Sequence, residues 1–131
     1  MISKIEEVMK SKPAFYASSG ASENDIRNAE TKLMLSFSDQ YAHYLSCFGF
    51  ALFEGHELTG ICKAPRLNVI DVTKQEREIY PNIPDDWYVV EQLNIDGIVI
   101  WQSTNGEIYQ TAPNTKPLKI YDSLAEYVES L

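Results

Sequence analysis

Two dipeptides in the second half of the chain, Asp96-Gly97 and Asn105-Gly106, constrain the fold more than any other feature. Such pairs supply the positive φ angles of tight β-hairpins, and these two separate three runs rich in β-branched and aromatic residues. The runs span residues 87–93, 98–102 and 107–111. We therefore expect an antiparallel meander. The middle run begins with four apolar residues without alternation, which is typical of a central strand covered on both faces.

The first part of the chain has the periodicity of helices. A capping-box spacing begins at Ser3, and Ser22 begins a second one with acidic residues in its first turn. Ser36 or Ser38 precedes a third helix. Its inner face would carry Tyr41, Tyr44, Leu45 and Phe48. A further capping box at Ser123 predicts a terminal helix.

The middle of the chain, from about residue 50 to residue 80, should form short strands and one short helix. Residues 50–53 and 56–61 flank a Glu54-Gly55 turn, and this arrangement predicts a hairpin. Residues 67–72 predict one more strand. A brief helix capped by Thr73 should follow it.

The chain has the size of one domain. At 131 residues it can bury a single core, and no linker or internal repeat separates its parts. We therefore predict a single α+β domain over residues 1–131. In this domain, N-terminal helices and a C-terminal helix pack on a mixed, largely antiparallel sheet.

Acidic and aromatic residues are concentrated where basic residues are missing. No Lys or Arg stands between Arg77 and Lys116, a stretch that holds both tryptophans and three tyrosines. A second cation-free stretch runs from Leu33 to Cys62. With a net charge of −8, this pattern predicts an anionic, aromatic surface for a basic partner. The alternative is that the acids only keep the protein soluble around an ordinary aromatic core. The residues expected to bind the partner are Glu54, Glu57, Asp85, Asp86, Trp87, Glu91, Asp96 and Glu107.

The acidic balance also restricts the partners and the location. Nucleic acids and anionic membranes attract clustered Lys and Arg, so we expect neither as a direct ligand. The first residues lack the apolar region of a signal peptide, and the longest apolar run, Phe48–Phe53, is too short to span a bilayer. These features favour a cytoplasmic protein. Cys47 and Cys62 should then be reduced, with Cys47 in the core; a disulfide between them is the alternative and would contradict that location.

No pattern of a catalytic or cofactor site stands out. His43 and His56 lack partners at metal-binding spacings, and His43 with Cys47, one helical turn away, supplies only two ligands. Glycine-rich phosphate loops and nucleophile elbows are missing as well. We expect a protein that is not an enzyme, with no catalytic residue, no metal and no cofactor.

Two glutamates keep an enzymatic alternative open. Strict alternation places Glu91 on the same strand face as Trp87 and Val89, and a carboxylate on a core face needs hydrogen-bond donors. Glu30 lies on the apolar stripe of the second helix, either as a buried cap or as the partner of Arg27. Buried carboxylates of this kind occur in active sites. A small hydrolase that uses Glu30 or Glu91 is therefore the alternative to a structural role.

Several sequence blocks between Ala21 and Tyr127 resemble, in their order and spacing, those of the SUKH superfamily. They are Ser22-x-x-x-Ile26-x-x-Ala29-Glu30-x-x-Leu33, Tyr41-x-x-Tyr44-Leu45-x-x-Phe48-Gly49, Glu57-Leu58-x-Gly60-Ile61, Tyr109-x-x-x-Pro113 and Ser123-Leu124-x-Glu126-Tyr127. The segment Leu35–Ser38 departs from the family pattern, which usually has a proline there.

The resemblance implies function by binding, on an α+β fold with helices packed on a sheet. Bacterial members of the superfamily are immunity proteins of the cytoplasm that block a toxin, often a nuclease, and nucleases tend to be basic because they hold phosphates. The implied partner is thus a cognate protein toxin, basic in charge, which this chain would neutralise by occlusion. A fungal member regulates cell-wall synthesis. It implies the alternative of a non-enzymatic adaptor that binds a housekeeping protein.

Overall fold

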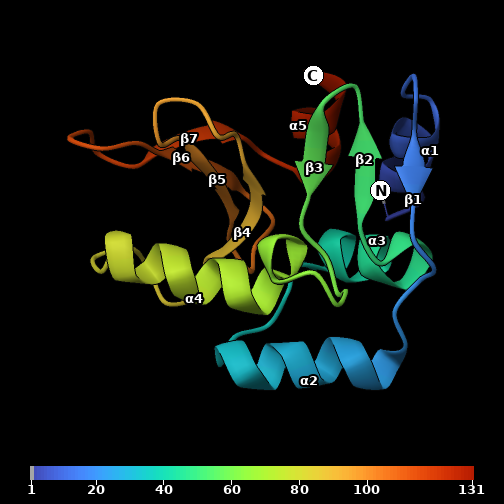
Figure 1. Cartoon of the computed structure of the whole chain (residues 1–131), viewed down its shortest axis with the longest axis horizontal. Helices are drawn as coiled ribbons and strands as arrows, with labels where there is room; N and C mark the ends of the chain where they lie inside the picture. Colours follow the sequence, from blue (N-terminus) through green and yellow to red (C-terminus); the bar gives the residue numbers. More distant parts are fainter. Residues whose placement is uncertain (1) are drawn as a thin grey trace.

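In the described part of the chain, one antiparallel sheet of seven strands organises the molecule, and helices cover both faces of the part formed by residues 88–92 and 99–102 (Figure 1). The structure is a computed structural model that describes the backbone of residues 2–131 and the side chains of residues 4–131. The strands are β1 (Tyr16–Ala17), β2 (Ala51–Phe53), β3 (His56–Leu58), β4 (Tyr88–Gln92), β5 (Val99–Gln102), β6 (Ile108–Thr111) and β7 (Leu118–Tyr121). The helices are α1 (Ile2–Lys10), α2 (Glu23–Leu33), α3 (Asp39–Phe48), α4 (Val69–Ile79) and α5 (Leu124–Glu129), with a short 3-10 helix, η1, at Pro65–Leu67. The predicted α+β class is confirmed.

The strands pair in chain order, and each of these pairings is antiparallel. The one parallel contact among residues 2–131 is an isolated bridge between Gly60 and Asn68. β3 and β4 share a single residue pair, Leu58 with Glu91. The sheet therefore has two parts joined at a narrow junction. We call them the first wing (β1–β3) and the second wing (β4–β7).

The predicted meander is confirmed. β4, β5 and β6 lie within the predicted runs, and β5 is buried along its whole length, as expected of a covered central strand. Asp96 and Gly97 have positive φ angles of 53° and 69°, and Gly106 has a φ of 96°. The second wing continues into β7, which the sequence pattern did not reveal. The first half of β7 is exposed, so it shows no alternation of buried and exposed residues.

Side-chain caps begin three helices where the sequence predicts them. Ser22, Ser38 and Ser123 each accept a hydrogen bond from a backbone N–H in the first turn of α2, α3 and α5. Of the two candidates for α3, Ser38 rather than Ser36 is the cap. The cap predicted at Ser3 lies outside the described side chains.

The strand predicted over residues 67–72 is wrong, because α4 begins within that segment. Asn68, and not Thr73, caps the helix, since its side chain accepts a hydrogen bond from Ile70 N at 2.9 Å. Thr73 lies inside α4 and accepts a hydrogen bond from Val89 N at 3.0 Å. This bond ties α4 to β4.

Two hydrophobic clusters lie on opposite faces of the second wing. The larger cluster packs against α1, α3 and α5. Its aromatic rings include Phe37, Tyr41, Tyr44 and Tyr88. The smaller cluster lies against α4 and consists of Val72, Trp87, Val89, Val99 and Trp101. Full burial of such side chains stabilises the fold by about 1.5–3 kcal/mol each, so both faces of β4 and β5 are fixed by packing.

The segment that follows β3 passes close to the end of α3. Ile61 N donates a hydrogen bond to Gly49 O at 3.0 Å. A Cβ atom on Gly60 would lie only 1.6 Å from Gly49 O, so no side chain fits at position 60. The two ends of the β2–β3 hairpin are therefore in direct contact.

Candidate partner-binding surface

The eight residues predicted to bind a partner fall into two groups near opposite ends of β4. The turn group surrounds the β2–β3 and β4–β5 turns and consists of Glu54, Glu57, Glu91 and Asp96. The entry group precedes β4 and β6 and consists of Asp85, Asp86, Trp87 and Glu107. Trp87, just before β4, and Glu91 within it are four residues apart, a distance of roughly 13 Å. The structure does not bring the eight residues into one patch.

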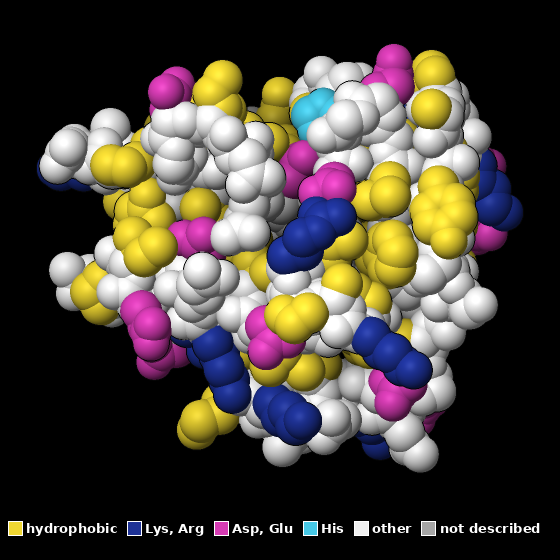
Figure 2. All heavy atoms as spheres, viewed as in Figure 1, with side chains coloured by type: hydrophobic (Ala, Val, Ile, Leu, Met, Phe, Trp, Pro, Cys, Tyr) yellow, Lys and Arg dark blue, Asp and Glu magenta, His cyan; other side chains and the backbone are white. Residues whose placement is uncertain are grey.

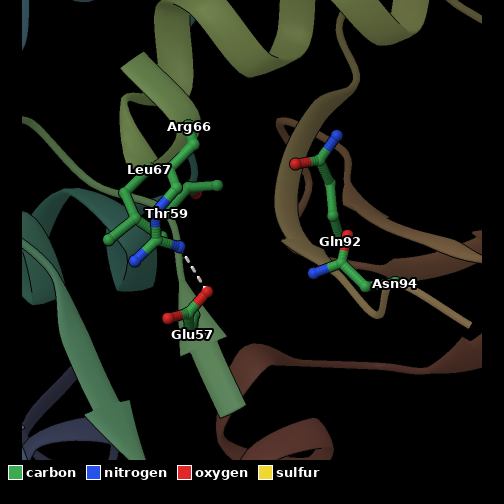
Figure 3. Close-up of a pocket in the computed structure, with 6 residues that line it drawn as sticks. All are labelled: Glu57, Thr59, Arg66, Leu67, Gln92 and Asn94. Atoms are coloured by element: carbon green, nitrogen blue, oxygen red, sulfur yellow. Dashed lines mark hydrogen bonds and ion pairs between the residues drawn. The ribbon is translucent and has the colours of Figure 1, made fainter. Parts of the chain in front are cut away.

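Glu57 and Glu91 of the turn group line a groove between β3 and the end of β4, and Glu54 and Asp96 stand at its rim, each next in sequence to a lining residue. Two cavities, of about 240 and 90 Å³, share the lining residues Glu57, Gln92 and Asn94. In the smaller one, Glu57 and Arg66 lie on one side and Gln92 and Asn94 on the other (Figure 3). Ile95, which lines the larger one, is 58% exposed. A hollow with an exposed apolar side chain and polar surroundings is the common anatomy of a protein-binding surface.

Basic residues from outside the cation-free stretches reach both groups. Arg66 forms an ion pair with Glu57, and Lys119 forms one with Glu107 at 3.1 Å. The guanidinium of Arg77 donates hydrogen bonds to backbone carbonyl groups at the start of β4. Figure 2 accordingly shows Lys and Arg side chains next to Asp and Glu on the face in view. The negative charge of the surface is therefore less concentrated than the linear sequence predicts.

The entry group is largely bonded within the fold. Tyr109 donates a hydrogen bond to Glu107 at 2.6 Å. This bond, followed by the hydrogen bond and charge of Lys119, lowers the pKa of Glu107 below its ordinary value. The ring of Trp87 stacks on that of Tyr109 with a centroid distance of 4.1 Å, and Trp87 is only 6% exposed. Trp87 is thus a core residue that a rigid partner cannot reach.

Glu91 is also buried, and each of its carboxylate oxygens has a partner. His56 Nδ1 lies 2.9 Å from one oxygen, and the hydroxyl of Tyr127 donates to the other. Burial and the nearby charge of Glu91 raise the pKa of Tyr127, so its hydroxyl keeps the proton that this bond needs. Glu91 therefore connects β3, β4 and α5 and does not belong to the accessible surface.

A β-bulge in β4 explains the direction of Glu91. Val89 lies opposite Trp101 on β5, whereas Glu91 lies opposite the next residue, Ile100. The extra residue turns Glu91 to the face of the larger hydrophobic cluster. The prediction that Glu91 shares a face with Trp87 and Val89 is wrong for this reason.

Glu30 is half-buried and bonds to the backbone of a loop, so it is neither the buried helix cap nor the partner of Arg27 that the sequence left open. Its carboxylate accepts a hydrogen bond from Phe37 N at 2.8 Å, in the link between α2 and α3. Arg27 pairs with Glu23 instead, at 2.9 Å. The carboxylates of Glu30 and Glu91 thus both accept hydrogen bonds that hold the fold together.

Sequence reasoning missed most residues of the groove, among them Arg66, Gln92, Asn94 and Ile95. Ile95 offered a signal, because it is an apolar residue inside a polar turn. The others offered none, since their proximity depends on the pairing of β3 with β4.

The two cysteines do not form a disulfide. Cys47 and Cys62 are free thiols, as expected, but Cys47 is half-buried and not a core residue. Burial raises the pKa of both thiols above the ordinary value.

Among the helices of residues 2–131, none has the length and apolar character needed to cross a bilayer.

Comparison with known proteins gives one finding on the whole chain. A protein-family model, SUKH_5, described as SMI1-KNR4 cell-wall, matches residues 1–131. The match includes the first helix, which lies outside the blocks that resemble the superfamily. A search of curated proteins finds no match.

Proposed function

The chain belongs to the SUKH family, and we propose that it is an immunity protein that binds a cognate toxin domain in the cytoplasm and neutralises it by occlusion. Proteins of this family are immunity or regulatory proteins that act through protein–protein interaction. We further propose that the toxin is basic, as a nuclease is, and that it binds the turn-group groove.

The observation that carries this proposal is the chemistry of the groove rim. Glu54 and Asp96 are exposed, and no ion pair among the described side chains involves either of them. Both have positive φ angles, 45° and 53°, and stand in tight turns. Ile95 lies next to Asp96 and is exposed. Basic residues of a partner can therefore meet free carboxylates around an apolar contact.

The entry group supports such a partner less well. Trp87 is buried, and Glu107 already has Lys119 and Tyr109 as partners. Asp86 accepts a hydrogen bond from a backbone N–H. We therefore assign the proposed surface to the groove.

Co-expression tests the proposed activity. A toxin domain encoded beside the gene of this chain should kill cells when expressed alone, should be harmless with the chain, and should co-purify with it. Rescue without physical association would show that direct binding is the wrong mechanism.

Charge reversal tests the proposed surface. Glu54→Lys combined with Asp96→Lys should weaken binding to that toxin roughly 10- to 100-fold, mainly by slowing association, and the wild-type association rate should fall as salt rises. The matched control, Glu7→Lys combined with Glu78→Lys, makes the same change in net charge at two exposed carboxylates outside both groups. Equal losses of affinity in the two double variants would show that the toxin does not bind at the groove. An association rate that salt leaves unchanged would remove the electrostatic part of the proposal.

The connection of the family model with the cell wall favours a second candidate, a non-enzymatic regulatory adaptor that binds a housekeeping protein. The groove suits either partner. A gene for a large polymorphic toxin immediately upstream supports the immunity role, whereas capture of the same housekeeping protein in cells without such a gene supports the adaptor.

A further inference from the structure

A cluster of three metal-binding side chains lies between α1 and α3, and it is separate from the groove. Its members are Glu6 of α1 and His43 and Cys47 of α3. A carboxylate oxygen, a ring nitrogen and the sulfur all lie within 4.8 Å of one another. The three side chains are half-buried. We propose that this cluster binds a zinc ion.

Two of the three separations between the ligand atoms match those of a tetrahedral zinc site, and the third is within 4.8 Å. His43 Nε2 lies 3.4 Å from Cys47 Sγ and 3.6 Å from Glu6 Oε1. Zinc holds nitrogen and oxygen ligands at about 2.0–2.2 Å and sulfur at about 2.3 Å. With tetrahedral angles, these bond lengths place neighbouring ligand atoms roughly 3.3–3.6 Å apart. His43 therefore already stands at a suitable distance from both other ligands, and an ion would need to draw only Glu6 and Cys47 towards each other.

Two helices in contact hold the ligands in place. His43 and Cys47 are one helical turn apart and lie on one face of α3. Ile5, which is fully buried, anchors α1 in the core, and α1 lies against α3. Lys10 donates a hydrogen bond to the second oxygen of Glu6 at 3.0 Å and so fixes the direction of the carboxylate. Partners of this kind orient metal ligands.

The types of ligand indicate which metal fits. A thiolate, an imidazole and a carboxylate together suit Zn²⁺, whereas Mg²⁺ and Ca²⁺ prefer sites made of oxygen alone. Three protein ligands leave the fourth tetrahedral position to water or to a ligand from another molecule. Since the ligands come from two helices, the ion would fasten α1 to α3.

Titration of the full-length chain, without an affinity tag, with Zn²⁺ in competition with a chromogenic chelator tests the proposal. We expect one ion per chain. Co²⁺ in place of Zn²⁺ should give the visible absorption of tetrahedral coordination and a thiolate-to-cobalt charge-transfer band. Cys47→Ser should abolish that band and weaken zinc binding at least about 100-fold, and Glu6→Gln should weaken it at least about 10-fold. Cys62→Ser, the matched control at the other free thiol, should change neither the charge-transfer band nor the affinity for zinc.

Two results would overturn the proposal. One is the absence of stoichiometric zinc binding by the wild-type chain, which would leave the cluster as an ordinary hydrogen-bonded group. The other is zinc binding that Cys62→Ser reduces and Cys47→Ser does not. Circular dichroism checks the fold of each variant. If Cys47→Ser fails to fold, the cobalt spectra of the wild type and of Glu6→Gln still test whether the metal binds at this cluster.

Discussion

Two clusters in this protein place a histidine beside a glutamate, and they differ in how completely the glutamate is bonded. In the buried cluster, His56 and Tyr127 each bind one carboxylate oxygen of Glu91. In the half-exposed cluster, Glu6 faces His43 at 3.6 Å, beyond hydrogen-bonding distance. The same residue types therefore hold the fold together in one place and leave room for a ligand in the other.

Burial accounts for this difference. Glu91 is 2% exposed, and a buried charge without hydrogen-bond partners costs several kcal/mol, so its donors are essential for folding. Glu6 remains in contact with water, which solvates its carboxylate and screens its ion pairs. Substitutions in the two clusters should consequently differ most in their effect on stability.

The largest effect is expected from Glu91→Ala. The change removes the acceptor of both His56 and Tyr127 at the junction of the two wings, so the free energy of unfolding should fall by about 3–5 kcal/mol. Urea denaturation measures it. Glu6→Ala, as the exposed counterpart, should leave the midpoint nearly unchanged, and similar losses in the two variants would contradict the contrast between the clusters.

Tyr127→Phe should have the next largest effect. It removes one hydrogen bond to a buried carboxylate and keeps the ring, so we expect a loss of about 2 kcal/mol in the same measurement. Tyr121→Phe is the matched control, because its ring lies 6.0 Å from that of Tyr127 and no described hydrogen bond involves its hydroxyl. Equal losses would show that the ring, and not the bond to Glu91, matters.

Glu107 is a half-buried counterpart of Glu91, because a tyrosine donates to it as well. Its folded pKa is below the ordinary value of 4.5, through the bond from Tyr109 and then through Lys119. A lowered pKa stabilises the folded state above the unfolded pKa, and this contribution is lost as the pH falls through the folded value. The Tm difference between the wild type and Glu107→Gln should therefore be present at neutral pH and vanish in acid below 4.5. A difference that stays constant with pH would contradict this.

The smallest effect is expected from Cys47→Ser in metal-free buffer. The side chain is half-buried and makes one weak contact with His43, so the free energy of unfolding should change by less than about 0.5 kcal/mol. Added zinc should then raise the Tm of the wild type and leave that of the variant unchanged. A large loss of unfolding free energy in metal-free buffer would show that Cys47 contributes to core packing and does not bind a ligand.

The local parts of the fold were predictable from the sequence. The Asp96-Gly97 turn and the cap at Ser38 act within a few residues, and the chemistry of those residues is sufficient to identify them. The strand predicted over residues 67–72 failed for a related reason. Its apolar residues fit either a strand or a helix, and the cap at Asn68 decided between them.

The parts that could not be predicted depend on contacts between distant segments. The bulge that turns Glu91 to the other face of β4 follows from pairing with β5, and strand alternation carries no sign of it. Arg66 and Lys119 form ion pairs with acids that lie nine and twelve residues away along the chain. Likewise, His43 and Cys47 supply two ligands in sequence, and Glu6 joins them only because α1 lies against α3.

The contact between Gly49 and Gly60 has a consequence for how this protein can change. Because the two ends of the β2–β3 hairpin are in direct contact, residues can be inserted at its turn while the rest of the fold stays unchanged. Each doubling of a flexible loop costs only about 0.6 kcal/mol. Glu54 lies in that turn, so insertions there would reshape the proposed partner-binding surface at a small cost in stability.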